Sequence, residues 1–268
     1  MGITEEKNKN KLYIPEIDGL RAIAIIAVVL NHLDFKFLKS GYLGVDMFFV
    51  ISGYVITKSV MNQKYLSFSD FIKYFFERRI KRLLPALLFY VIAVSLIVCL
   101  FNPYPSVSIR TGFFSLLGLS NFYLFKYSTD YFAQASYLNP FINTWSLAIE
   151  EQFYLIFPAI LYLSGLFKNE RKTNFKLIQI IFTLSILSLI LFLRNYYLYS
   201  SFSYFLLPTR FWEIGFGVLT FLTFSKFKEF FIKKISNSLL QFQLLGISGL
   251  FMILFSTNQF SQFKTLLV

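Results

Sequence analysis

Residues 16–33, "EIDGLRAIAIIAVVLNHL", decide the class of fold. An apolar run fills the middle of this stretch, while Glu16, Asp18 and Arg21 stand at its start and His32 near its end. Its length is close to the roughly 20 residues with which a helix crosses the hydrocarbon layer of a membrane. We therefore expect a membrane helix with charges at one end and the only histidine of the chain near the other.

The composition of the whole chain extends this interpretation. The 268 residues are 56% hydrophobic and only 15% charged, and the mean hydropathy is +0.59. Soluble domains are about one quarter charged, so a soluble core is not expected. The predicted fold is all-α, a polytopic transmembrane helical bundle. Residues 1–12 form a basic cytoplasmic tail in this prediction, and residues 13–268 form one membrane domain.

Seven stretches are apolar enough and long enough to be predicted as membrane spans. An eighth apolar stretch, 112–125, is short for a span, and we expect it to be re-entrant or interfacial. The chain is thus predicted to have seven to eight membrane segments. The seven predicted spans are 17–34, 43–60, 83–101, 141–165, 175–193, 206–225 and 239–257.

The distribution of basic residues orients these spans. The net charge is +12, and the Lys and Arg residues lie between apolar runs, which does not fit a nucleic-acid-binding surface. If the N-terminus is cytoplasmic and 112–125 does not cross, most of the 26 Lys and Arg residues fall on the cytoplasmic side. No cleavage site of small residues follows His32, so the first helix is expected to remain uncleaved. The single cysteine, Cys99, excludes a disulfide within the chain and a metal site built on cysteines.

Residues 67–82, "SFSDFIKYFFERRIKR", predict a basic helix lying on the cytoplasmic face of the membrane. Ser67 or Ser69 can cap its N-terminus. Two interpretations of its basic side remain open. The side anchors the helix to lipid headgroups, or it binds the phosphates of a cytoplasmic ligand through Arg78, Arg79 and Arg82.

Arg21 and His32 lie eleven residues apart, close to three whole helical turns. They therefore project from nearly the same face of the helix, roughly 16 Å apart along its axis. A charged group inside a membrane costs about 2.5–3.5 kcal/mol on insertion scales, so it usually faces protein or a water-filled path. Snorkelling of Arg21 and an interfacial position of His32 are the alternatives. Asp18 is the expected ion-pair partner of Arg21.

Further polar residues fall at membrane depth in the predicted spans. They include Asp46 in the second span, Glu150 and Glu151 in a later one, and the pair Arg210 and Glu213, three residues apart. An ion pair between Arg210 and Glu213 would account for two of them structurally. An ordinary structural bundle seldom needs so many, which favours a polar interior with a function.

Four motifs together resemble the acyltransferase-3 family of integral membrane acyltransferases. The resemblance runs from Tyr13 to Val218, and the spacing from Arg21 to His32 is the signature of that family. The motifs are, in chain order, "DGLRAIAIIAVVLNH" (18–32), "GYLGVDMFFVISGY" (41–54), "FFERRIKRLLPA" (75–86) and "NTWSLAIEEQFY" (143–154).

This resemblance implies an enzyme that transfers an acyl group, usually acetyl, from acyl-CoA to a hydroxyl of a carbohydrate. Expected acceptors include surface polysaccharide, lipopolysaccharide and lipid-linked or cell-envelope glycans. The implied setting is a bacterial inner membrane. His32 and Arg21 are carried over as catalytic residues, with Asp46 and Glu150 as motif acids. Acyl-CoA is a substrate, so no permanently bound cofactor and no metal are expected.

The chemistry of acyl transfer assigns roles to these residues. His32 is the expected general base for the acceptor hydroxyl, or else a transient acyl carrier. Arg21 would position the donor or stabilise developing charge, and the three arginines at 78, 79 and 82 would hold the donor phosphates.

Two departures from the family pattern stand beside the resemblance. Many relatives have a histidine where Asn143 precedes Thr-Trp-Ser-Leu, so His32 must act without it. Family domains also usually continue through further spans, so this one is expected to be shorter. A transporter of a small anionic or glycan-related substrate and a non-catalytic remnant remain the alternative functions.

Overall fold

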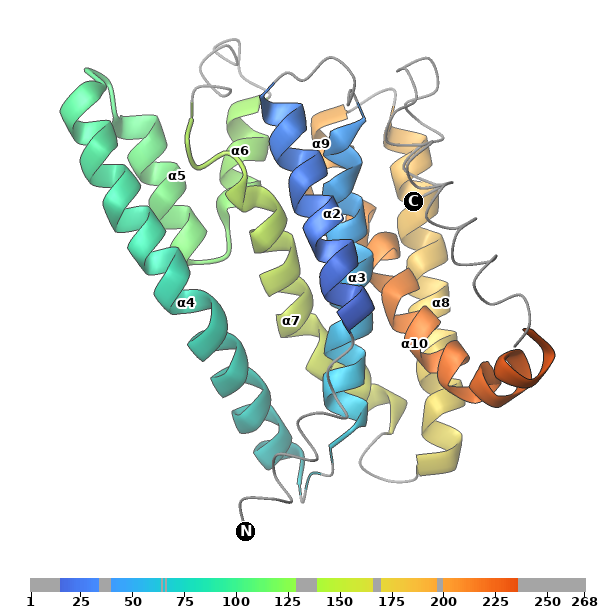
Figure 1. Cartoon of the computed structure of the whole chain (residues 1–268). Helices are drawn as coiled ribbons and strands as arrows, with labels where there is room; N and C mark the ends of the chain where they lie inside the picture. The colour runs from blue at the N-terminus through green and yellow to red at the C-terminus, as the bar shows by residue number, and fades with distance from the viewer. Residues whose placement is uncertain are drawn as a thin grey trace. The chain divides into compact units, whose positions relative to one another are not determined.

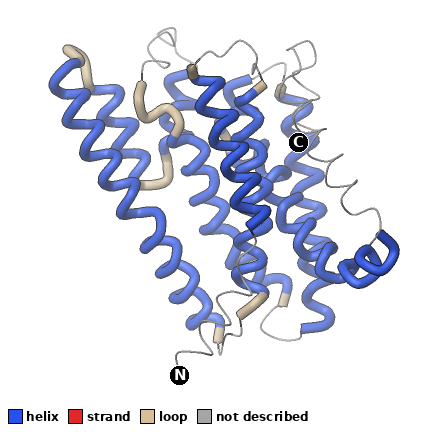
Figure 2. The backbone as a smooth tube through the Cα atoms, viewed as in Figure 1, coloured by secondary structure: helices blue, strands red, loops and turns tan. Residues whose placement is uncertain are grey.

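The computed structural model describes residues 15–33, 40–63, 65, 67–128, 139–165, 170–196 and 200–235. Every regular element in these residues is a helix, as Figure 2 shows, which confirms the predicted all-helical class. The chain divides into two compact units, residues 1–62 with 216–268 and residues 63–215. They are called the first unit and the second unit below.

The first unit is held together by close contact between helix backbones. A Cβ atom on Gly41 or Gly44 would collide with the backbone carbonyls of Ala27 and Ala24, both of which are buried. Small residues allow membrane helices to approach this closely. The unit contains α2 (Pro15–His32), the 3-10 helix η1 (Gly41–Leu43), α3 (Gly44–Met61) and residues 216–235 of α10 (Leu207–Ile235).

A second face of α3 carries a similar contact with α10. Gly217 lies against the backbone carbonyl of Val50, where any side chain would collide. The rings of Tyr54 and Phe221 meet edge to face at 5.5 Å between their centroids. Helix α3 is therefore packed on two sides, which explains why it is the most buried of the four candidate membrane spans among the described residues.

From α4 to α9, each helix of the second unit contacts the next one along the chain (the helices are labelled in Figure 1). One of its apolar clusters joins Phe141 to Leu87 and Val91 of α4. Gly112 of α5 faces this cluster, and a Cβ there would press on the Phe141 ring at 3.2 Å. The unit contains α4 (Phe68–Phe101), α5 (Ser106–Leu116), α6 (Ser120–Ser128), α7 (Thr144–Ser164), α8 (Glu170–Asn195), α9 (Ser200–Phe205) and residues 207–215 of α10.

Four helical segments are long and apolar enough to cross a membrane: Gly41–Met61, Phe68–Phe101, Thr144–Ser164 and Asn174–Asn195. They contain or closely match the predicted spans 43–60, 83–101, 141–165 and 175–193. The predicted spans 17–34 and 206–225 fall on α2 and α10, which are helical and carry charges in their first turns. The predicted span 239–257 lies outside the described residues.

The structure corrects the prediction of a separate basic interfacial helix at 67–82. Those residues and the predicted span 83–101 form one helix, α4, which continues through Pro85. Proline removes one backbone hydrogen bond, but membrane helices tolerate this loss where neighbouring groups compensate for it. Ser67 caps the helix, as expected, by accepting a hydrogen bond from the Asp70 amide at 3.1 Å. At 1.5 Å per residue, the 34 residues of α4 extend about 51 Å.

The short apolar stretch 112–125 is broken into the end of α5 and most of α6. Gly118 stands between the two helices with φ +66°, a left-handed conformation that suits glycine. The amides of Gly118 and Leu119 bond to the carbonyls of Ser115 and Phe114, which is the Schellman arrangement at a helix end. The Gln152 side chain of α7 donates to the Gly118 carbonyl at 2.9 Å. The break is therefore built into the structure and agrees with a segment that does not cross as one helix.

The break gives a prediction for Gly118→Ala. The left-handed conformation costs a residue with a Cβ about 1–2 kcal/mol, and this Cβ would also lie 2.6 Å from the Glu151 Oε2. Gly165 provides the matched control, because it has φ +84° and no atom near its Cβ position. Thermal unfolding of the purified protein in detergent should show a larger loss of stability for Gly118→Ala than for Gly165→Ala. Equal losses would mean that the Glu151 side chain moves aside at no cost.

Candidate functional site

Arg21 lies in the first half of α2, where its guanidinium is held by an acidic partner. The Arg21 Nη1 is 3.2 Å from the Asp18 Oδ1, and the Arg21 side chain is 25% exposed. This confirms the predicted pair, which follows from the spacing of three residues on one helix. Asp18 also lies in the first turn of α2, where the helix dipole favours a negative charge. The guanidinium is therefore oriented along its own helix.

His32 ends α2, and its ring orientation is fixed by the same helix. Its Nδ1 lies 2.8 Å from the backbone carbonyl of Val28. A carbonyl oxygen can only accept, so Nδ1 carries the proton in this contact and Nε2 is the basic nitrogen of the neutral ring. The ring is exposed at the surface of the first unit. This arrangement suits a general base that is oriented before its substrate arrives.

Asp46 belongs to the first turn of α3, in the same unit as Arg21 and His32. It is 4% exposed, and it follows Gly44, through which α3 packs against α2. A carboxylate in the first turn of a helix is stabilised by the helix dipole. The "GVD" sequence thus joins the helix contact and the acidic group within three residues.

Glu150 lies in α7 of the second unit, one turn before Tyr154. The Tyr154 hydroxyl donates a hydrogen bond to the Glu150 Oε2 at 3.0 Å. Tyr154 was not predicted as a site residue, although the four-residue spacing in "EEQFY" places it on the face of Glu150. The motif acid is thus oriented by a neighbour from its own motif.

The three predicted phosphate-binding arginines of α4 have different surroundings. Arg78 and Arg82 are exposed, and Arg78 donates to the Tyr74 hydroxyl at 2.7 Å. Arg79 is half-buried, and its guanidinium carbon lies 4.6 Å from the centre of the Tyr154 ring. Two of the arginines are therefore available at the surface, while Arg79 turns toward α7.

The chain just before α4 supports Arg78. Gln63 donates to the same Tyr74 hydroxyl at 2.6 Å, and the Tyr65 ring packs edge to face on Tyr74 at 6.0 Å. Burial raises the pKa of Tyr65 to about 12, an effect that Tyr74 increases and Arg78 opposes. Tyr65 therefore stays neutral well above physiological pH.

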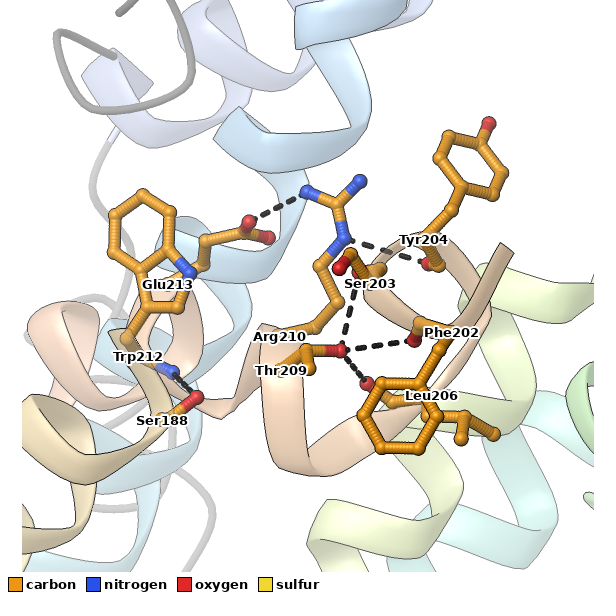
Figure 3. A network of polar contacts seen from close by, with 9 residues as sticks. All are labelled: Ser188, Phe202, Ser203, Tyr204, Leu206, Thr209, Arg210, Trp212 and Glu213. Carbon is orange, nitrogen blue, oxygen red and sulfur yellow. Dashed lines mark hydrogen bonds and ion pairs between the residues drawn. The ribbon is translucent and has the colours of Figure 1, made fainter. Parts of the chain in front are cut away.

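A buried ion pair forms a second polar centre of the second unit, as Figure 3 shows. The Arg210 Nη1 and the Glu213 Oε1 are 2.6 Å apart, with side chains 7% and 1% exposed, which confirms the predicted pair. The guanidinium carbon also lies within 6 Å of the ring centres of Trp145, Phe192 and Tyr204. These rings belong to α7, α8 and α9, so one side chain of α10 contacts three other helices. Trp145 is itself buried, at 4% exposed.

The sequence matches one known family over most of its length. A family model described as an acyltransferase domain of family 3 matches residues 14–268. The chain belongs to the acyltransferase-3 family. The resemblance inferred from the four motifs is thereby confirmed, and in this acyltransferase-3 domain the motifs hold Arg21 and His32, Asp46, the arginines of α4, and Glu150.

Two similar proteins are O-acetyltransferases. The O-acetyltransferase OatA of Staphylococcus aureus (strain NCTC 8325 / PS 47) is 36% identical over 250 residues, which cover 91% of this chain and 40% of the relative. The peptidoglycan O-acetyltransferase OatA of Listeria monocytogenes serovar 1/2a is 42% identical over 153 residues, which cover 57% of this chain and 25% of the relative. The acyltransferase-3 chain thus spans less than half the length of these curated relatives. No solved structure matches it significantly.

Proposed function

We propose that this acyltransferase-3 chain is a membrane O-acyltransferase domain that transfers an acetyl group from acetyl-CoA to a hydroxyl of a cell-envelope glycan. The observation that carries the proposal is the pair of oriented groups on α2. Asp18 holds the Arg21 guanidinium, and the Val28 carbonyl holds the His32 ring with Nε2 as its basic nitrogen. The names of both relatives support acetyl as the transferred group, and the name of the Listeria monocytogenes relative, a peptidoglycan O-acetyltransferase, supports a cell-wall glycan as the acceptor class.

In the proposed reaction, His32 is the general base. Its Nε2 takes the proton of the acceptor hydroxyl while the hydroxyl oxygen bonds to the thioester carbonyl carbon. The carbon–sulfur bond then breaks, and the imidazolium returns the proton to the departing coenzyme A thiolate. The products are an ester and coenzyme A. The neutral imidazole serves as the base in the first half of this exchange, and the imidazolium that it becomes serves as the acid in the second half.

The other charged side chains that the motifs carry have separate roles in the proposal. Arg21 stabilises the negative charge that develops on the thioester oxygen, because a guanidinium offers fixed donors. Arg78, Arg79 and Arg82 bind the phosphates of coenzyme A. Asp46 and Glu150 take part in the proposal as the motif acids.

We further place the protein in a bacterial cytoplasmic membrane with its N-terminus in the cytoplasm and seven spans. The break at Gly118 supports this topology, because a segment that does not cross leaves most Lys and Arg on the cytoplasmic side. The basic end of α4 then faces the compartment that contains coenzyme A. The hydrocarbon layer is about 30 Å thick, so α4, with its 34 residues, extends beyond it.

Membrane vesicles containing the chain and supplied with labelled acetyl-CoA test the function. We expect label to become covalently attached to glycan in an alkali-labile ester. Label that crosses the membrane without attachment would instead establish a transporter, which the broken α5–α6 segment could also serve. Vesicles that neither attach nor move label would identify a non-catalytic remnant.

A further inference from the structure

Tyr154 occupies a position between two charged groups of the second unit. Its side chain is 6% exposed and packs against Phe75 of α4, with the ring centres 6.5 Å apart. The face of its ring meets the Arg79 guanidinium carbon at 4.6 Å. Its hydroxyl donates to the Glu150 Oε2 at 3.0 Å. One tyrosine of α7 therefore contacts both a predicted donor-binding arginine and a motif acid.

The contacts of Arg79 explain why this arginine differs from its neighbours on α4. Its guanidinium also lies 5.9 Å from the centre of the Phe75 ring, so it has aromatic faces on two sides. Arg78 instead turns to Tyr74 of its own helix, where it donates to the hydroxyl. The inward position of Arg79 thus depends on Tyr154, which is the ring contributed by another helix.

The two ends of the Tyr154 side chain have separable chemistry. The aromatic face attracts a guanidinium through its electron density, and this attraction does not need the hydroxyl. The hydroxyl donates to a carboxylate, and a hydrogen bond to a charged group is among the stronger ones in proteins. A change that removes only the hydroxyl should therefore affect Glu150 and leave Arg79 in place.

We propose that Tyr154 is a positioning residue for acyl transfer. Its ring holds Arg79 where it meets the phosphates of the donor, and its hydroxyl holds the Glu150 carboxylate in its working orientation. This inference rests on the proposed acyltransferase function. It assigns donor binding and the catalytic step to different parts of one side chain.

The test uses Tyr154→Phe and Tyr154→Leu in the whole chain in nanodiscs. Calorimetric titration with coenzyme A gives the number of intact binding sites and the Kd, and turnover is then expressed per site. Tyr154→Phe should lower kcat per site about tenfold, the size expected for one lost hydrogen bond to a charged group, with the Kd unchanged. Tyr154→Leu should also weaken coenzyme A binding about fivefold, as expected for a lost cation–π contact.

Tyr162→Phe is the matched control, because Tyr162 lies on the same helix and is 54% exposed. It should leave turnover and the Kd unchanged. A merely structural role of Tyr154 would reduce the number of binding sites and leave kcat per site unchanged, which would overturn the inference. An unchanged Kd in Tyr154→Leu would overturn the role of the ring. A wild-type chain that binds no coenzyme A would overturn the proposed function, and the inference would fall with it.

Discussion

We expect the replacement of His32 by Ala to lower the proposed glycan acetylation by a factor of about 10²–10⁴, the usual contribution of a positioned general base. The reason is that Nε2 is the basic nitrogen of a ring whose Nδ1 is bonded to the Val28 carbonyl. Initial rates in vesicles with labelled acetyl-CoA measure the effect. Coenzyme A binding should persist, because the proposed phosphate ligands lie on α4.

A second His32 variant and a control on the same helix complete the test of the base. His32→Gln keeps a polar side chain without a base at neutral pH, so it should be as inactive as His32→Ala. Val29→Ala changes an exposed apolar residue of the same helix and should leave the rate near that of the wild type. Near-normal turnover of His32→Ala would eliminate the role of base.

Replacement of Arg210 by Ala has the largest expected effect on stability. It removes the cation from a Glu213 carboxylate that is only 1% exposed, and breaking a buried pair on one side costs about 3–5 kcal/mol. The midpoint of thermal unfolding in detergent measures the loss. A double variant, Arg210→Met with Glu213→Leu, should recover much of it, because neither charge is then buried.

The exposed pair of α4 provides the control for this prediction. The Lys81 Nζ and the Glu77 Oε1 are 2.6 Å apart, but both side chains are largely exposed. Exposed pairs contribute little, so Lys81→Ala should leave the unfolding midpoint unchanged. If Arg210→Ala also left the unfolding midpoint unchanged, the ion pair and its aromatic surroundings would not stabilise the second unit.

Local spacing explains which parts of the structure could be predicted. The pairs Asp18–Arg21 and Arg210–Glu213 each span three residues of one helix, and both were predicted and formed. The cap at Ser67 likewise depends on residues close in sequence. The continuous path of α4 through Pro85 could not be predicted, because the cost of a proline depends on the groups that surround the helix.

Contacts between distant segments account for most of what was not predicted. The rings around Arg210 come from three other helices, and no local pattern in the sequence joins them. Arg79 of α4 and Tyr154 of α7 likewise lie in contact although they are 75 residues apart in the sequence. The hydrogen bond from Tyr154 to Glu150 is a local contact that was also missed, although the four-residue spacing on one helix is visible in the sequence.

The anchoring of the α5–α6 break also constrains how the protein moves. Gln152 of α7 donates to the Gly118 carbonyl and to Asn121 of α6, and Ser120 donates to the Thr144 carbonyl of α7. These bonds satisfy two backbone carbonyls and the Asn121 side chain, so separating α6 from α7 would leave polar atoms without partners in an apolar medium. We therefore expect α6 and α7 to move together as one body in any rearrangement of the second unit.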